Sequence, residues 1–329
     1  MMLSIVATLF KSESTVDEFV RRSFASAEPL FTDIEMILVN DGSPDDSLQR
    51  ALRLRAGDPR ITVVDLSRNY GHHKAIMTGL AHAHGDLVFL LDSDLEEQPE
   101  YLAQFYQKLE ETGADVVFGV QKSRKGGLFE KVSGHLFFWA ANSICDQKMP
   151  PNTITARLMT HDYVRALVRH RHREFVLGHL FVMAGFVQQP VSVVKLSTSP
   201  STYTLANRFD MAIRYMTTTS TRLLYLVLFT GLTIAGIAGA AIVYFLLQYL
   251  FAGIHVDGWT STIMSVWFFG GLITLILGIL GIYIANILSE SKRGPYTTIR
   301  RLYRTNLGAD FRKSVSRPKD GDEHVYGHR

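Results

Sequence analysis

The sequence predicts an α/β domain, followed by two helices that are long enough to cross a membrane. Over residues 1–120, short apolar runs alternate with segments whose apolar residues recur at helical spacing, which is typical of a parallel sheet covered by helices on both faces. Between residues 223 and 291 there is no Lys or Arg, and two long apolar runs lie in that interval. The 329-residue chain is long enough for both parts.

The composition argues against a nucleic-acid-binding protein, a disulfide-stabilised protein and a cleaved signal peptide. The net charge is only +3, so overall charge does not indicate a nucleic-acid-binding protein. Cys145 is the single cysteine, so no internal disulfide can form, which suits a reducing compartment. The N-terminal stretch MMLSIVATLF lacks a basic region and a cleavage site, so we expect a strand there and not a signal peptide.

The alternation of elements begins at the N-terminus. Residues 3–10 predict a strand, and residues 14–31 predict a helix that Ser14 or Thr15 opens. Acidic residues in its first turn suit the positive end of the helix dipole. The same reasoning predicts strands at 34–43, 61–67, 86–94 and 114–120 and helices at 45–57, 73–85 and 100–113.

Four units follow from these patterns. Residues 1–204 form a globular domain, in which 150–159 are expected to be an irregular entry to a helix. Residues 205–222 predict an amphipathic juxtamembrane helix, which lies either in the headgroup region or against the domain. Residues 223–291 predict a two-helix transmembrane hairpin, and residues 292–329 a cytoplasmic basic tail.

The two apolar runs, 223–251 and 263–288, each exceed the roughly 20 residues that cross about 30 Å of hydrocarbon. A pair of buried core helices is the alternative, but core helices seldom stay apolar on every face for this length. The loop between the runs has no basic residue. The positive-inside rule therefore places the flanks, and the N-terminal domain with them, in the cytoplasm; the basic flanking residues are Arg208, Arg214, Arg222, Lys292, Arg293, Arg300, Arg301 and Arg304.

Two carboxylates follow an apolar run in the stretch FLLDSD. Asp92 and Asp94 end a predicted strand at the edge where ligands of parallel sheets bind, and an extended segment would place them on one side. Like charges so close need a cation, a proton or distance. A Mg²⁺ or Mn²⁺ ion bridging to a diphosphate satisfies this need, although a D-x-D also arises by chance on solvated surfaces.

Asp41, in the stretch VNDGS, ends the neighbouring predicted strand. Its carboxylate could accept a hydrogen bond from a base or ribose. Asp-Gly-Ser is also a strong turn sequence, so turn formation alone remains an alternative. We interpret the histidines as solvated or helix-capping residues, with His73 or Lys74, after NYG, as candidates to approach a nucleotide.

The ordered series VNDGS, LSRNYGHHKAIMTGL, GDLVFLLDSDLEEQPE and MPPNT…RLM, followed by the two apolar runs, resembles the polyprenyl-phosphate glycosyltransferases of glycosyltransferase family 2. This group includes bactoprenol glucosyltransferases, dolichol-phosphate mannose synthases and undecaprenyl-phosphate aminoarabinose transferases. The resemblance covers residues 2–305. It implies a GT-A (Rossmann-like) cytoplasmic domain, a nucleotide-sugar donor, a divalent metal ion, a polyprenyl-phosphate acceptor and a multi-pass protein of the inner, cytoplasmic membrane.

The resemblance also implies roles for single residues. The metal ligands would be Asp92 and Asp94, of which Asp94 is the favoured direct ligand. The nucleotide sugar would be bound by Thr8, Phe10, Glu13, Asp41 and Asp92. The catalytic residues would be Asp94, Arg124 and Arg157. The lipid phosphate would be bound by Lys122, Arg124, Arg157, Ser201 and Tyr203.

Three positions depart from the family pattern. Thr155 stands where the family usually has an acidic residue, two positions before Arg157, and Gln121 and Ser197 stand at usually basic positions. These departures indicate a different sugar donor, altered acceptor handling or reduced activity. We favour the first, because the residues implied for the metal and nucleotide are kept.

The expected reaction is an inverting transfer of a sugar, by default from UDP-glucose, to undecaprenyl phosphate, for modification of lipopolysaccharide or another cell-surface glycan. A processive or oligosaccharide-extending polysaccharide synthase is an alternative, although the Q-x-x-R-W element of such enzymes is absent. A catalytically impaired membrane scaffold is another. Small residues at intervals of four in both apolar runs could pair the helices into a homo-oligomer.

Overall fold

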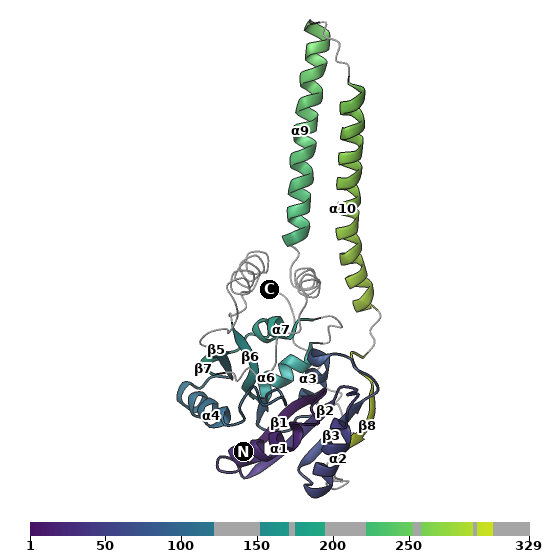
Figure 1. Cartoon of the computed structure of the whole chain (residues 1–329). Coiled ribbons are helices and arrows are strands. Elements are labelled where there is room, and N and C mark those ends of the chain that lie inside the picture. The colour runs from purple at the N-terminus through teal and green to yellow at the C-terminus, as the bar shows by residue number, and fades with distance from the viewer. Residues whose placement is uncertain (122–151, 171–174, 195–221, 253–257, 292–294, 305–329) are drawn as a thin grey trace, which may run out of the picture.

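The computed structural model describes residues 1–121, 152–170, 175–194, 222–252, 258–291 and 295–304. In this part of the chain, a mixed sheet of eight strands with helices on both faces forms the globular domain, and two long helices extend away from it in one direction (Figure 1). The four predicted units therefore begin with the expected α/β domain. The predicted juxtamembrane helix at 205–222 lies, except for its last residue, outside the described residues.

The sheet has the strand order β7-β5-β6-β4-β1-β2-β3-β8. Its centre is parallel, as predicted, since β1 pairs in parallel with β2 and β4, and β2 with β3. Two strands run against this direction: β6 lies antiparallel between β4 and β5, and β8 is antiparallel to β3. The strands are β1 (Met2–Leu9), β2 (Asp33–Asn40), β3 (Ile61–Leu66), β4 (Leu87–Leu90), β5 (Val116–Gln121), β6 (Thr153–Thr160), β7 (Gln188–Val193) and β8 (Ile299–Tyr303).

Side chains of β1 alternate between two cores, which confirms that both faces of the sheet are covered. Leu3, Ile5, Ala7 and Leu9 pack into the core under one set of helices, and Val6 packs into the core on the other face. The first face is covered by α1 (Val16–Ala27), α2 (Ser47–Gly57) and α4 (Tyr101–Thr112). The second face is covered by α3 (His72–Leu80), α6 (His161–Arg169) and α7 (Leu177–Met183).

The expectation of an irregular helix entry at residues 150–159 is wrong for its described part. Thr153–Thr160 is strand β6, and helix α6 begins directly after it. The physical reason is a period of two: Ile154, Ala156 and Leu158 are buried in turn, as in a strand that contributes to a core. The two prolines before this segment favoured an irregular conformation in the sequence-based prediction, so the alternation was not assigned to a strand.

The predicted tail also contributes to the domain. Residues 299–303 form β8, which pairs with β3 at the edge of the sheet. All but one of its side chains are exposed, and two of them are arginines, which is how proteins often protect an edge strand from further pairing. Without a buried face, such a strand carries no alternating apolar signal in the sequence.

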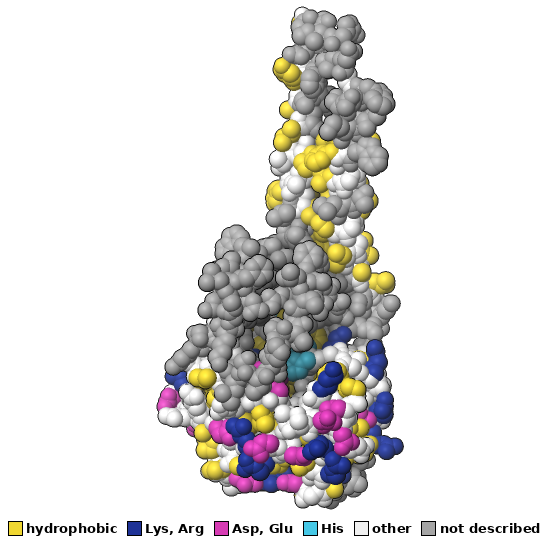
Figure 2. Space-filling view, in the orientation of Figure 1, with side chains coloured by type: hydrophobic (Ala, Val, Ile, Leu, Met, Phe, Trp, Pro, Cys, Tyr) yellow, Lys and Arg dark blue, Asp and Glu magenta, His cyan; other side chains and the backbone are white. Residues whose placement is uncertain are grey.

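The two long helices are α9 (Arg222–Ala252, 31 residues) and α10 (Trp259–Ser291, 33 residues). Within the described residues, one window is long and apolar enough to cross a membrane by length and composition, Phe268–Ala285 of α10. No residue of that window is buried. Helix α9 carries no charged residue after Arg222, and hydrophobic side chains lie exposed along both helices (Figure 2).

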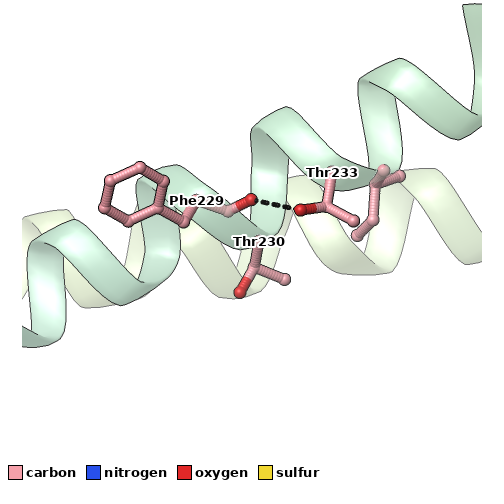
Figure 3. Close-up of a pocket in the computed structure, with 4 residues that line it drawn as sticks. Phe229, Thr230 and Thr233 are labelled. Atoms are coloured by element: carbon pink, nitrogen blue, oxygen red, sulfur yellow. Dashed lines mark hydrogen bonds between the residues drawn. The ribbon is translucent and has the colours of Figure 1, made fainter.

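A recess on α9 is lined by Phe229, Thr230, Thr233 and Ile234 (Figure 3). Thr233 Oγ1 donates to the carbonyl oxygen of Phe229 at 2.8 Å, so this hydroxyl is satisfied within its own helix. Three of the small residues at intervals of four, Gly231, Gly270 and Gly278, have open surroundings: a Cβ added at any of them would meet no atom within 4 Å. The described residues therefore give no support to pairing of the helices through small residues.

A polar network closes the edge of the sheet where β1 and β2 begin. Glu35 accepts hydrogen bonds from the Ser4 hydroxyl at 2.5 Å and from the backbone N–H of His84 at 2.6 Å, and its carboxylate lies 3.4 Å from the His84 ring. Burial alone would raise the pKa of Glu35, but the hydrogen bonds from His84 and Ser4 outweigh it and lower the pKa. The hydrogen bond to Glu35 raises the pKa of His84.

We expect Glu35→Gln to lower the melting temperature of the full-length protein by about 2–4 °C at pH 5.5, the equivalent of roughly 1 kcal/mol. The lowered pKa of Glu35 stabilises the fold above its ordinary value of 4.5, and the raised pKa of His84 stabilises it below 6.5. The difference should therefore shrink as the pH falls below 4.5 or rises through the pKa of folded His84. A pH-independent difference, or an equal effect of Glu110→Gln on the exposed face of α4, would refute this assignment.

Gly42 offers a second test, with Gly113 as its matched control. Both glycines have a left-handed φ, +59° and +61°, but a Cβ at Gly42 would lie 2.5 Å from the backbone of Arg68 and Asn69, whereas a Cβ at Gly113 would meet nothing within 4 Å. We expect Gly113→Ala to cost about 1 kcal/mol of unfolding free energy and Gly42→Ala about 3 kcal/mol. Equal losses in chemical denaturation would show that the close approach at Gly42 is unimportant.

Candidate active site

The carboxyl ends of β1, β2, β3 and β4 meet at one edge of the sheet, where open α/β sheets bind their ligands. Thr8 lies at the end of β1, Asp41 directly after β2, and Asp92 two residues after β4. The structure thus brings together three of the residues that the sequence assigned to the nucleotide sugar. The loop 67–71, between β3 and α3, completes this edge.

His72 links two of these predicted residues. Its Nδ1 lies 3.1 Å from the Thr8 hydroxyl, and its Nε2 lies 3.3 Å from Oδ1 of Asp92. Burial lowers the pKa of the His72 imidazole, but the hydrogen bond and the charge of Asp92 outweigh this effect and raise the pKa above its ordinary value. When protonated, the ring partly neutralises the charge of the Asp92 carboxylate.

His72 was not among the residues predicted to lie at this edge. The sequence favoured His73 or Lys74 as neighbours of a nucleotide, and the other histidines were expected to be solvated or capping residues. The structure places His72 as the first residue of α3, directly after Gly71 with its φ of +95°, so that the chain turns the ring toward β1 and β4. Burial lowers the pKa of the neighbouring His73 to about 4, so that ring is neutral at pH 7.

Asp41 anchors the loop 67–71. Its two carboxylate oxygens accept the backbone N–H groups of Tyr70, at 2.7 Å, and Gly71, at 3.0 Å. Only 2% of the residue is exposed, and burial raises the pKa of Asp41. The carboxylate therefore does more than form a local turn, because it fixes the loop that carries His72. Contact of Asp41 with a base or ribose stays a prediction.

The expectation that an extended segment aligns Asp92 and Asp94 is wrong. Strand β4 ends at Leu90, and the chain turns at Ser93 and Asp94. Asp94 is exposed and accepts the backbone N–H of Glu96 at 2.9 Å, whereas the side chain of Asp92 is only 19% exposed. The two carboxylates have different surroundings, because Asp92 is held beside His72 while Asp94 faces solvent.

The first loop, after β1, is held by serine hydroxyls. The Ser12 hydroxyl lies 3.0 Å from the Ser93 hydroxyl, which donates to the carbonyl oxygen of Thr8 at 2.7 Å. This pair ties the first loop to the D-x-D turn. Of the predicted nucleotide-binding residues in the loop, Phe10 is 44% exposed at this edge, and Glu13 accepts the backbone N–H of Asp46 at 3.1 Å.

Arg157 lies on β6 and is buried. Its Nε and Nη2 donate to the carbonyl oxygens of Thr155, at 3.0 Å, and Ile154, at 3.1 Å, and its guanidinium lies 3.3 Å from the ring centroid of Phe181. Burial lowers the pKa of Arg157 to about 10, so the group remains charged at neutral pH. The structure shows a brace for the start of β6, and binding of a lipid phosphate by Arg157 stays a prediction.

Glu97 is a second residue that the sequence analysis missed. It is 1% exposed, and its Oε1 accepts the backbone N–H of Thr155 at 2.9 Å. A carboxylate thus contacts position 155, where the family usually has an acidic side chain. In the sequence, Glu97 belongs to an acidic pair shortly after the D-x-D. Such a pair has the same pattern as two solvated surface residues, so the sequence does not indicate that Glu97 is buried.

Four of the predicted residues, Lys122, Arg124, Ser201 and Tyr203, lie outside the residues that the structure describes, as does Ser197. Gln121, the last residue of β5, is half-buried, and its backbone N–H donates to the carbonyl oxygen of Asn152 at 3.0 Å. The predicted acceptor side of the site is thus represented by Arg157 alone among the residues assigned to it.

The donor set fits a metal ion that shares its ligands with a substrate. No group of three or more His, Cys, Asp or Glu side chains that could hold a metal occurs within the described ranges. Two carboxylates near one strand end suit Mg²⁺ or Mn²⁺, because such ions commonly take one or two protein carboxylates and complete their shell with substrate phosphates and water. A closed protein cage does not fit this edge.

Curated relatives match nearly the whole chain. A Mycobacterium tuberculosis protein described as a glycosyltransferase is 45% identical over 307 residues, which are 93% of this chain and 90% of that protein. The prophage bactoprenol glucosyl transferase homolog of Escherichia coli is 26% identical over 305 residues, covering 92% and 99% of the two chains. The bactoprenol glucosyl transferase of Shigella phage SfII is 27% identical over 311 residues, covering 93% and 100%.

Solved structures are more distant. The glucosyl-3-phosphoglycerate synthase of Mycobacterium tuberculosis, in complex with Mn²⁺ and UDP-glucose, has a TM-score of 0.44 and 19% identity and covers 66% of this chain and 77% of that one. TarS of S. aureus, in complex with UDP-GlcNAc, has a TM-score of 0.43 and 18% identity and covers 66% of each chain. Similarity at this level supports no statement about the site of this chain.

The domain known as glycosyl transferase family 2 matches residues 4–173, more than half of the chain. This range contains β1 from its third residue, all of β2 to β6, and every residue of the edge described above. With this match, with a relative of 45% identity over nearly all of its length, and with a GT-A-like mixed sheet, the chain belongs to glycosyltransferase family 2 and is a glycosyltransferase enzyme.

Proposed function

We propose that this enzyme transfers a sugar from a nucleotide-sugar donor, by default UDP-glucose, to a polyprenyl phosphate at the cytoplasmic face of a membrane. The observation that carries this proposal is the convergence of Thr8, His72 and Asp92 at the carboxyl edge of the sheet, in a chain that also carries two long apolar helices. A diphosphate would bind at this edge. The helices hold the domain at the bilayer, where a polyprenyl chain must stay.

The curated relatives support the lipid acceptor. The bactoprenol glucosyl transferases match 91% or more of this chain, so the similarity includes the region of α9 and α10 as well as the sheet. A two-helix hairpin through the inner membrane, with the domain in the cytoplasm, is part of the proposal. The exposed apolar surface of both helices supports it, since such a surface suits lipid better than water.

The residues of the chain would act on the donor as follows. Asp94 and Asp92 would hold the Mg²⁺ or Mn²⁺ ion. When bound, this ion would stabilise the leaving diphosphate. His72, which contacts Asp92, would place a donor group beside the same phosphates, and Thr8 would keep its ring oriented. Asp41 would keep the loop 67–71 in place under the nucleotide.

A phosphate acceptor needs less catalytic assistance from the protein than an alcohol acceptor would. A phosphate monoester is already anionic at neutral pH, so no general base is required to remove a proton before its oxygen attacks the anomeric carbon. Attack in line with the departing diphosphate would invert that carbon. Arg157, which keeps its charge in a buried position, would attract the lipid phosphate toward the site.

A transfer assay tests the proposal. Full-length protein in detergent is incubated with undecaprenyl phosphate, Mn²⁺ or Mg²⁺, and a panel of UDP-, GDP- and dTDP-sugars, and the lipids are analysed by mass spectrometry. We expect one hexose per lipid with one class of donor, and no product with EDTA. Chains of several sugars would instead indicate a polysaccharide synthase, and the absence of product with every donor would contradict the proposal.

We expect Asp94→Asn to lower turnover at least about 100-fold, because a carboxylate ligand of the ion is lost where charge develops. An Asn oxygen can still accept the backbone N–H of Glu96, so the melting temperature should stay within about 2 °C of the wild type. The matched control is Asp86→Asn, at the opposite end of β4, where the carboxylate accepts the backbone N–H of Met2. Full activity of the Asp94 variant would contradict the metal assignment.

We expect His72→Ala to raise the KM for the nucleotide sugar about tenfold, since a hydrogen bond to a charged group is worth roughly 1.5 kcal/mol. The KM for undecaprenyl phosphate should change less than twofold. His82→Ala is the control, because this histidine lies just beyond the other end of α3, where its Nδ1 lies 2.8 Å from the carbonyl oxygen of Thr78. Equal KM changes for both substrates would argue against a donor-side role.

A further inference from the structure

The segment that follows α10 returns to the sheet and holds the loop 67–71. The backbone N–H of Ser67 donates to the carbonyl oxygen of Thr298 at 2.9 Å, and Nη2 of Arg300 donates to the carbonyl oxygen of Ser67 at 2.7 Å. Both backbone groups of Ser67 are therefore fixed by residues more than 200 positions later in the chain. Contacts of such sequence separation are unlike the local bonds that usually close a loop.

Further contacts extend this C-terminal clamp, which we define as residues 296–303. Strand β8 pairs with the end of β3, with Arg301 opposite Asp65. The Thr297 hydroxyl lies 2.8 Å from the hydroxyl of Thr78 on α3, and Tyr296 packs against the core under that helix. The clamp thus holds the loop 67–71 from both of its flanking elements, β3 on one side and α3 on the other.

The opposite side of the loop forms the donor edge. Tyr70 and Gly71 donate their backbone N–H groups to Asp41, and the next residue, His72, contacts Thr8 and Asp92. Only the five residues of the loop separate the C-terminal clamp from the predicted diphosphate site. The backbone of the loop is also packed tightly, since a Cβ at Gly42 would lie 2.5 Å from it.

We infer that the C-terminal clamp is a positioning element of the donor site: by fixing Ser67, it sets the loop that Asp41 anchors and whose far end places His72 against a nucleoside diphosphate. This inference rests on the proposed function. Four residues, 292–295, separate the clamp from the end of α10, so five peptide units of at most about 18 Å connect that helix to it. The donor site is therefore built partly from the chain that leaves the membrane.

Arg300→Ala tests the clamp itself in the full-length protein. Arg300 is exposed, so its loss should not unfold the domain, and Arg301→Ala is the matched control because it removes the same charge from the neighbouring position of β8. We expect hydrogen exchange of the peptide covering residues 67–72 to quicken at least about threefold in Arg300→Ala, to stay unchanged in Arg301→Ala and to be restored in Arg300→Lys. Unchanged exchange in Arg300→Ala would overturn the clamp.

Nucleotide titration tests its link to the donor site. We expect the Kd for UDP with MnCl₂, measured by calorimetry, to rise about five- to tenfold in Arg300→Ala and less than twofold in Arg301→Ala, roughly the effect of one hydrogen bond. Faster exchange without a change in Kd would show that the clamp is structural only and would refute the inference. A wild-type protein that binds neither UDP, GDP nor dTDP would instead refute the proposed function, and the inference with it.

Discussion

The main constraint on this edge of the sheet is the negative charge of Asp92, which lies just after the end of a buried parallel strand. Asp92 stands two residues after β4, at the edge where four parallel strands end, and a carboxylate in such a place is costly without a partner. His72 provides that partner, and Thr8 orients its ring. Each of the three side chains comes from a different element, so the bridge also fixes β1, α3 and the D-x-D turn relative to one another.

This bridge explains the organisation of the loops around it. The position of His72 depends on the loop 67–71. Asp41 accepts hydrogen bonds from the end of this loop, and the residues that follow α10 bind its first residue. The first loop and the D-x-D turn are joined by the hydroxyls of Ser12 and Ser93. Rigid positioning of this kind is what a diphosphate site needs, because two phosphates and a metal ion tolerate little displacement of their ligands.

Periodicity was enough to predict the centre of the fold. The strands that became β1 to β5 are apolar runs separated by helical patterns, and their parallel arrangement and two-sided cover follow from that alternation. β6, β7 and β8 were not predicted, because β6 follows two prolines, β7 contains a proline and has only two buried residues, and β8 has almost no buried side chain. Strands at these places depend on long-range pairing, which local patterns do not encode.

The residues of the site also divide into those that local sequence patterns indicate and those that only long-range contacts reveal. That Thr8, Asp41 and Asp92 lie at one edge of the sheet could be predicted, because they end apolar strands or match a family motif. His72 and Glu97 could not, because their importance comes from contacts across 20 or more residues: His72 with Asp92, and Glu97 with Thr155. A histidine after a glycine and an acidic pair after a turn have no distinguishing pattern in one sequence. Their surroundings appear only when the strands are assembled.

We propose that the carboxylates at the end of β4 bind a divalent cation together with a nucleoside diphosphate. Electron paramagnetic resonance of Mn²⁺, titrated with full-length protein in the presence and absence of UDP, measures this most directly. We expect the signal of free Mn²⁺ to fall sharply only when protein and UDP are both present. In a protein with Asp92→Asn and Asp94→Asn, we expect the signal to stay at the level of Mn²⁺ with UDP alone. Binding of Mn²⁺ and UDP by that double variant as tightly as by the wild type would show that these carboxylates do not hold the ion.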